Sequence, residues 1–303
     1  MQKRHHTIPC CYLDNFTDSD GWVWVLDTKN EIIRIRPKNI LVENHFYRIT
    51  LKDGSKSLVV ENALSDIEGV YATIFREKIA KDIPLTPQER ANVAVFVAAM
   101  LHRTRPHREN TRRMFETLKK NMEEWREQVK TITPEQRRTL NATPSGGGAT
   151  ITPEELDAGL EDFDELHAAH LIPQTMHTAQ IIFNMKWAVL EIRDGGTTFV
   201  TSDSPLVVER PAAIKKFGRN AFGSRPGMLF EDAEATLPLS RDRMLLAGWI
   251  LNQDSYAEMP SELAEQLNQR TILHSSQRLI ASSKVQLEGV KTKYPPRSHD
   301  ETI

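Results

Sequence analysis

The chain has 303 residues, of which 39% are hydrophobic and 26% are charged, and its formal net charge is -2. This composition is that of an ordinary globular protein, and it excludes a broadly basic nucleic-acid coat and an acidic solvating tail. No apolar run approaches the roughly 18 residues of a membrane span. The basic start MQKRHH is not followed by an apolar signal segment. We therefore expect a cytoplasmic protein with no membrane partner.

Cys10 and Cys11 are the only two cysteines. Neighbouring cysteines join each other only through a strained small ring, so we do not expect a structural disulfide. The favoured interpretation is a pair of small, half-buried thiols. Thiol chemistry is the alternative.

Three stretches predict β-hairpins, because apolar and polar residues alternate on both sides of a short turn. They are residues 21–36, 45–61 and 187–203, with TKN, KDGS and DGG as their turns. Further strands are predicted within 199–209, 235–240 and 243–251, and a final helix over 261–273.

The middle of the chain predicts helices. Residues 61–80 carry apolar side chains at helical spacing, and residues 85–105 open with a capping box from Thr86 to Glu89. The centre of this second helix is apolar all round, so we expect it to run through the core. Pro106 should end or kink it. A third helix then carries apolar residues on one face: Met114, Phe115, Leu118, Met122 and Trp125.

These elements predict a single α+β domain over residues 1–303. N-terminal β-hairpins and C-terminal strands surround a helical middle with one buried helix, and the two ends of the chain could share a sheet. The glycine-rich residues 141–151 predict a flexible loop, and residues 294–303 predict a frayed tail.

Two carboxylates fall inside the apolar stripe of the helix over 61–80. At about 100° per residue, Glu61 and Glu68 share the face of Leu64 and Tyr71. A buried carboxylate is costly unless a cation or a metal ion pairs with it, so each needs a partner. The favoured interpretation is a structural ion pair or an edge position that reaches water. The alternative is a general base or a metal ligand.

Arginines cluster just after the apolar helix. Five of them lie between residues 103 and 113, against the single acidic residue Glu109, and Arg103 falls on the core-facing line of the helix. Guanidinium groups fork onto the paired oxygens of a phosphate or a carboxylate. A solvated helix end is the alternative interpretation. Contact with a nucleic-acid backbone is less favoured, because no stacking aromatic residues are interleaved.

His6 and Asp203 complete the set of candidate residues. A histidine beside a carboxylate can shuttle protons near neutral pH, although a structural role is the commoner one. Asp203 follows a predicted strand in TSDSP, where it can form an Asx turn or contribute to a site on a rigid scaffold. The motifs HExxH, GxGxxG, GxxxxGK[ST] and GxSxG are absent from the sequence, which disfavours a zincin, a dinucleotide fold, a P-loop and a nucleophile elbow.

Several of these stretches together resemble one microbial family. HTIPCCYLDNF (6–16) combines His-x-x-Pro with an aromatic-Leu-x-x-Phe pattern, and AAMLHRTRP (98–106), FVTSDSPLVV (199–208) and LPLSRD (237–242) follow in the same order. The chain thereby resembles the family called domain of unknown function 4238. That resemblance implies a fold and one constellation of His6, Glu68, Arg103 and Asp203. It implies no activity, because the family has none established.

The leading hypothesis is an enzyme that hydrolyses or cleaves a phosphate-bearing substrate, either a nucleotide or a nucleic acid. Arg103, with Arg105 or Arg108, would bind the phosphate. His6 would act as acid or base.

Glu68 and Asp203 would either orient His6 or hold a divalent cation. The alternative function is a non-catalytic ligand-sensing or interaction protein in a stress or phage-defence setting. A third interpretation makes the cluster structural and places the function on an exposed helical face. The sequence predicts neither metal dependence nor oligomeric state.

Overall fold

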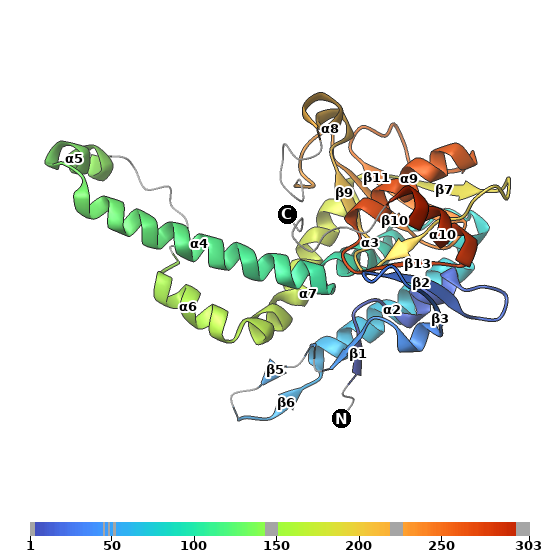
Figure 1. Ribbon diagram of the computed structural model, residues 1–303, viewed down its shortest axis with the longest axis horizontal. Helices are drawn as coiled ribbons and strands as arrows, with labels where there is room; N and C mark the ends of the chain where they lie inside the picture. Colours follow the sequence, from blue (N-terminus) through green and yellow to red (C-terminus); the bar gives the residue numbers. More distant parts are fainter. Residues whose placement is uncertain are drawn as a thin grey trace.

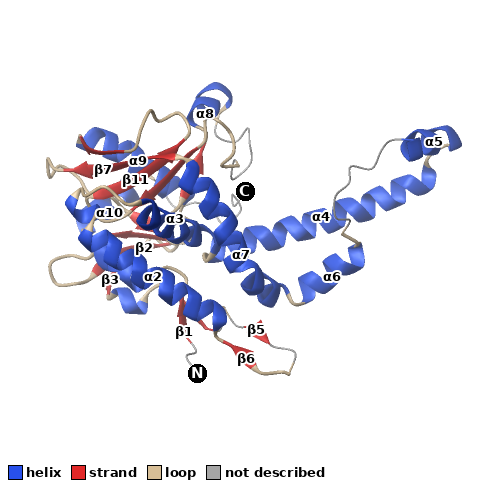
Figure 2. Cartoon of the chain, turned by 180° about the vertical axis from the view of Figure 1, so that it is seen from behind, coloured by secondary structure: helices blue, strands red, loops and turns tan. Residues whose placement is uncertain are grey.

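The computed structural model describes residues 4–44, 46–47, 49–50, 53–142, 151–218 and 227–294. A body of sheets and helices carries a long helical arm that projects from one side (Figures 1 and 2). None of the helices in these described ranges combines the length and the apolar character that crossing a membrane requires. The predicted α+β class is confirmed.

The larger sheet has five strands in the order β12, β7, β11, β10, β9. Its strands are β7 (Lys186–Ile192), β9 (Val207–Glu209), β10 (Glu234–Pro238), β11 (Arg243–Gly248) and β12 (Ser255–Met259). All neighbours are antiparallel except β12 and β7, which run parallel. This sheet is therefore built wholly from residues 186–259.

The second sheet joins the two ends of the chain. Its order is β3, β2, β13, β8, with β2 (Val23–Asp27), β3 (Ile32–Ile35), β8 (Thr201–Ser202) and β13 (Arg278–Ala281). The strand β13 pairs antiparallel with β2, so that Ile280 lies opposite Val25. The expected sharing of one sheet by the two ends is confirmed, and so is the first hairpin.

Short strands extend the N-terminal part. The strand β1 (Arg4–His6) pairs with β4 (Val42–Asn44), and β5 (Ile49–Thr50) pairs with β6 (Lys56–Ser57). Between them lie α1 (Cys10–Leu13) and the 3-10 turns Asp14–Phe16 and Pro37–Asn39. The segment that carries His5 and His6 is thus an ordered edge strand.

A series of helices follows the N-terminal strands along the chain. They are α2 (Val59–Glu77), α3 (Pro87–His102), α4 (Arg105–Thr131), α5 (Pro134–Ala142), α6 (Pro153–Glu161), α7 (Phe163–Asn184) and α8 (Pro211–Phe217). A 3-10 turn, Ile79–Lys81, follows α2. The helices α9 (Ser261–His274) and α10 (Lys284–Lys293) complete the chain.

The helix predictions are largely confirmed. Thr86 and Glu89 form both hydrogen bonds of the capping box, and α3 ends at His102. A new helix starts at Arg105 with Pro106 in its first turn, because proline fits there and not in a helix interior. The helix over 261–273 is present but is not the last one, since α10 follows it.

Two hairpin predictions need correction. Residues 187–203 do not form a hairpin, because β7 pairs with β11 and β12 whereas β8 pairs with β13 in the other sheet. Among the described residues of the stretch 45–61, Ile49–Thr50 and Lys56–Ser57 form the antiparallel pair, whereas residues from Val59 onward belong to α2 and not to a strand. Apolar alternation alone does not name a strand's partner. The predicted loop falls mostly on residues 143–150, and the predicted tail on 295–303, both outside the described residues.

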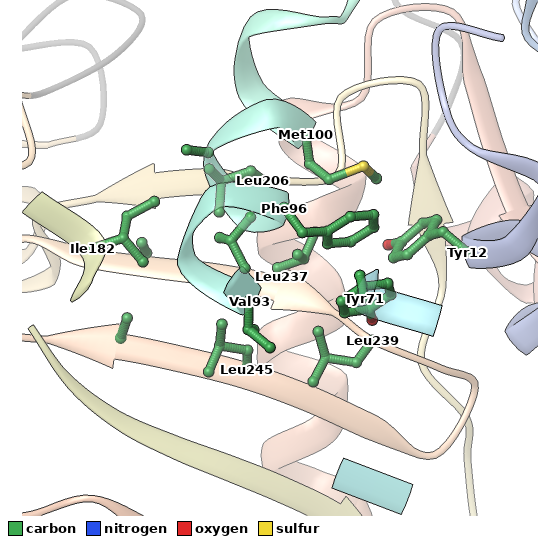
Figure 3. Close-up of a cluster of buried hydrophobic side chains, with 14 of the residues drawn as sticks. Tyr12, Tyr71, Val93, Phe96, Met100, Ile182, Leu206, Leu237, Leu239 and Leu245 are labelled. Atoms are coloured by element: carbon green, nitrogen blue, oxygen red, sulfur yellow. The ribbon is translucent and has the colours of Figure 1, made fainter. Parts of the chain in front are cut away.

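The core lies between α3 and the sheets (Figure 3). The rings of Tyr71 and Phe96 stack with centroids 3.5 Å apart and an interplanar angle of 1°. Phe96 also lies beside Tyr12, with centroids 6.2 Å apart. The prediction of a buried helix is therefore confirmed for α3.

Tyr12 connects the two sheets. Its hydroxyl donates to the carbonyl oxygen of Pro238 in β10 at 2.6 Å and lies 2.7 Å from the Thr201 hydroxyl in β8. A phenol has one proton to donate, so Thr201 donates to Tyr12. Asn15 adds a bond from its amide to the Leu239 carbonyl at 3.1 Å. The N-terminal segment is thus held in the interior by polar as well as apolar contacts.

We expect Tyr12→Phe to lower the free energy of unfolding by roughly 1–3 kcal/mol, because it leaves the buried Pro238 carbonyl and Thr201 hydroxyl without their partner. Urea unfolding followed by circular dichroism measures the change. Tyr256→Phe is the matched control, since its hydroxyl bonds the Ile83 carbonyl in an exposed setting. Equal losses in the two variants would contradict the connecting role of Tyr12.

Candidate functional site

Arg103 is the centre of the candidate site. It caps the C-terminal end of α3 and is only 2% exposed. Its guanidinium donates to Glu68 Oε1 at 2.7 Å and to the backbone carbonyl of His6 at 2.7 Å. Burial by itself would lower the pKa of Arg103, but Tyr47 and Glu68 more than offset this, so the pKa is raised and the group is cationic.

Glu68 has the cationic partner that a carboxylate in an apolar stripe needs. Glu68 lies on α2 with its side chain 24% exposed, and it forms an ion pair with Arg103. Glu68 lies at the middle of α2, and Arg103 lies at the C-terminal end of α3, from where it also reaches the His6 carbonyl of β1. The ion pair therefore ties α2, α3 and the N-terminal strand together.

The neighbouring histidine, His5, has the buried ring in β1. His5 is 4% exposed, its Nδ1 accepts from the backbone N–H of Tyr47 at 3.1 Å, and its Nε2 lies 3.2 Å from Glu61 Oε2. The ring of Tyr47 stacks on it at 5.4 Å. The second stripe carboxylate thus also has a partner, but that partner is His5, which the sequence did not single out.

His6 has a different position. It is half-buried and pairs with Val42 in the ladder between β1 and β4, and its carbonyl accepts from both Arg103 and the Tyr47 hydroxyl. The contact with Arg103 is therefore made by the backbone of His6. The catalytic role of its ring stays a prediction.

The other arginines line the first turns of α4. Arg105 is exposed and pairs with Glu109 at 2.6 Å, whereas Arg108 pairs with Glu43 at 3.3 Å. The guanidinium of Arg108 also lies 4.0 Å from the centre of the Phe46 ring. Cations at this N-terminal turn add to the positive end of the helix dipole, so this surface favours an anion.

Asp203 lies in the loop between β8 and β9. It is 6% exposed, and its two carboxylate oxygens accept from the backbone N–H groups of Ser276 at 3.0 Å and Gln277 at 2.8 Å. Burial raises the pKa of Asp203, although these backbone bonds partly offset the rise. Its negative charge also raises the pKa of Arg105, after the larger effect of Glu109. Asp203 therefore lies within electrostatic range of the first turn of α4.

The structure brings His6, Glu68 and Arg103 into direct contact, through the backbone in the case of His6. The hydrogen bonds of the Asp203 carboxylate go to Ser276 and Gln277, and its charge acts on Arg105. Within the described ranges no three His, Cys, Asp or Glu residues are arranged to hold a metal ion. Holding a divalent cation with Glu68 and Asp203 stays a prediction.

The two cysteines lie beside this site but are not activated. Burial raises the pKa of Cys10 to about 11 and that of Cys11 to about 12. Both are free and half-buried, and Cys11 contacts the backbone carbonyl of Glu68 at 3.9 Å. At neutral pH both remain thiols, which disfavours the nucleophilic interpretation.

Three further histidines, His102, His107 and His167, lie close together, and we did not predict this group from the sequence. His102 Nδ1 lies 3.1 Å from His107 Nε2, and His102 Nε2 lies 2.8 Å from the Thr178 hydroxyl. His167 on α7 is 5% exposed, and neither of its ring nitrogens has a hydrogen-bond partner. The signal was present in the sequence, because Phe163, His167 and Leu171 recur at helical spacing on the buried face of α7.

Comparison with known families agrees with the sequence resemblance. A family model described as protein of unknown function (DUF4238) matches residues 4–285. The chain belongs to the DUF4238 family. No curated protein and no solved structure matches it. The match includes every site residue named above.

In this DUF4238 protein we expect Glu68→Ala to lower the free energy of unfolding by about 3 kcal/mol, because it leaves the buried Arg103 guanidinium without its counter-ion. Replacing both partners, as in Arg103→Met with Glu68→Leu, should cost less than Glu68→Ala alone. Urea unfolding measures both.

Glu77→Ala serves as the control, because Glu77 forms only exposed ion pairs with Arg76 and Lys81. Its loss should change the stability little, because exposed ion pairs contribute little to folding. A Glu68→Ala variant no weaker than this control would show that the buried pair is not a stabilising contact of the DUF4238 chain.

His167 should make the stability of this DUF4238 protein depend on pH. Burial, with the charges of Arg108 and His102, lowers the pKa of His167 from its ordinary 6.5 to about 4. The unfolded chain therefore takes up the proton first as the pH falls. Stability is lost between about pH 6.5 and 4, in total by roughly 3 kcal/mol.

Unfolding free energies measured across this pH range test the expectation. His167→Phe, which keeps a ring between Phe46 and Phe163, should flatten the profile. His170→Gln removes an exposed histidine and should leave it unchanged. A His167→Phe profile as steep as that of the wild type would assign the effect to other groups.

Proposed function

We propose that this chain binds a phosphate-bearing ligand, a nucleotide or a nucleic-acid strand, at the first turns of α4 and hydrolyses or cleaves it. The observation that carries the proposal is the row of arginines at a helix N-terminus. Arg105, Arg108 and Arg112 follow one another at intervals of three and four residues in the first turns of α4, and a single acidic residue, Glu109, lies among them on the helix. Phosphate oxygens are the ligands that such a surface binds best.

The geometry divides the arginines into two roles. Arg103 already donates to Glu68 and to the His6 carbonyl, so a ligand could bind it only by displacing Glu68. Arg105 pairs with the exposed Glu109, and such an exposed pair is weak enough for Arg105 to turn toward a ligand. In the proposal Arg105 and Arg108 bind the phosphate, and Arg103 positions the strand that carries His6.

His6 is the proposed acid or base, because it is the half-buried histidine of that strand and an imidazole ring can donate or accept a proton. Glu68 orients the segment through Arg103. Asp203 places a buried negative charge within range of Arg105. Glu68 and Asp203 are the residues proposed to hold a divalent ion.

A second candidate function is non-catalytic ligand sensing, for which a stress or phage-defence setting is the proposed context. The carboxylates favour it, because both are engaged by the scaffold: Glu68 by Arg103, and Asp203 by the backbone of Ser276 and Gln277. A site of this kind would bind a phosphate and report it through the α3–α4 junction without turnover.

The binding half of the proposal is tested by thermal shift with inorganic phosphate, a nucleoside triphosphate and a short single-stranded RNA. A ligand that binds the folded chain raises its melting temperature by mass action. Each arginine lost should weaken binding about tenfold or more, because a charge-assisted hydrogen bond contributes roughly 1.5–3 kcal/mol. Arg105→Gln with Arg108→Gln should therefore abolish the shift.

The control is Arg76→Gln, which removes an exposed arginine from α2 and should keep the shift. The catalytic half is tested by product formation from each bound probe. His6→Ala keeps the carbonyl that Arg103 binds, so it should retain the thermal shift and lose turnover. Binding without turnover in the wild type would favour the sensor, and the absence of any shift would overturn both functions.

A further inference from the structure

The arm formed by α4 carries an apolar stripe that the described chain does not cover. Met114 is 60% exposed, Leu118 is 41% exposed and Trp125 is 55% exposed. With Asn121 they follow one another at intervals of four, three and four residues, which is the spacing of a coiled-coil seam. We call these four residues the arm stripe. Large apolar residues grouped on a projecting helix mark an interaction surface.

The rest of α4 shows which of its faces is already occupied. Figures 1 and 2 both show α6 along one side of the arm. Lys119 pairs with Asp157 of α6, Arg126 lies 3.6 Å from Glu154, and Phe115 packs on Phe163 at 5.9 Å. Each of these α4 residues directly follows a residue of the arm stripe. The stripe therefore borders the α6 contact and faces away from it.

The charges beside the arm stripe identify its partner. On the flank opposite α6, Arg113 and Lys120 are basic, and Glu124 and Glu127, farther along, are acidic. A parallel pair of such helices would place like charges together. An antiparallel pair places Arg113 opposite Glu127 of the second copy, and the same contact occurs twice by symmetry.

The apolar side chains agree with the same register. In an antiparallel seam centred between residues 119 and 120, Met114 lies beside Trp125 of the second copy, and Leu118 lies beside its Asn121. An asparagine at one seam position fixes the register of such a pair. The helix has 27 residues and is thus about 40 Å long, so each of these two contacts can form twice along the pair of helices.

We propose that two copies of this chain associate through their arms, with the two α4 helices antiparallel and the arm stripes in contact. Trp125 is the anchor, since a large aromatic residue that becomes buried in an interface contributes much of its affinity. The dimer does not depend on the function proposed for the arginines.

Sedimentation equilibrium or light scattering over a range of protein concentration tests the association. The wild type should be a dimer, and Trp125→Glu or Leu118→Glu should weaken the association by at least about tenfold with an unchanged circular dichroism spectrum. Val285→Glu is the matched control, because Val285 is 75% exposed on α10. It should leave the dimer intact.

The orientation is tested by charge reversal. Arg113→Glu should weaken the dimer, and adding Glu127→Arg to the same chain should restore it, because in an antiparallel pair each new glutamate faces a new arginine. A monomeric wild type, or a Trp125→Glu variant that dimerises as tightly as the wild type, overturns the proposal. Failure of the double charge reversal to restore the association overturns the antiparallel pairing.

Discussion

The buried charge of Arg103 is the constraint on which the candidate site depends. A guanidinium taken out of water must regain both charge neutrality and hydrogen bonds, or the fold loses several kcal/mol. Glu68 supplies the charge at 2.7 Å, and the carbonyl of His6 supplies an acceptor at the same distance. One side chain thereby fixes the relative positions of α2, of the end of α3 and of the N-terminal strand. If any one of these contacts is removed, the remaining contacts no longer fix the relative positions of these elements.

The N-terminal strand is ordered for the same reason. Segments near a chain end usually fray unless specific contacts hold them. Here the strand is held at His6 by Arg103, at His5 by Glu61, and farther along at Tyr12 by the two sheets. These contacts reach elements from the middle and from the last third of the chain, so the position of the segment depends on the packing of those elements.

What the sequence could predict follows from the range of the interactions. Two features could be predicted from short stretches of sequence: the capping box at Thr86 and the helix break before Pro106. The need of Glu68 for a cationic partner could also be predicted, because Glu68 falls in an apolar stripe and burying a charge is costly. The partner of β7 could not be predicted, because several alternating strands were equally suitable and β11 lies far along the chain. The pairing of His5 with Glu61 could not be predicted for a similar reason: in a strand, a shift of one residue exchanges the two faces.

The helix α4 carries both the arginines of the candidate site and the arm stripe. Its first turns carry Arg105 and Arg108 beside the Arg103 network, and its middle carries the arm stripe. A helix is stiff along its axis, so an arm fixed at its middle by a second copy would also fix its base. The contact that Arg108 makes with Glu43 and the contact that Arg103 makes with Glu68 lie on the two sides of the break at Thr104. Thr104 caps α4 immediately after α3 ends. The orientation of the arm and the packing of the buried Arg103 therefore both depend on this break, and a change in one must be accommodated there by the other.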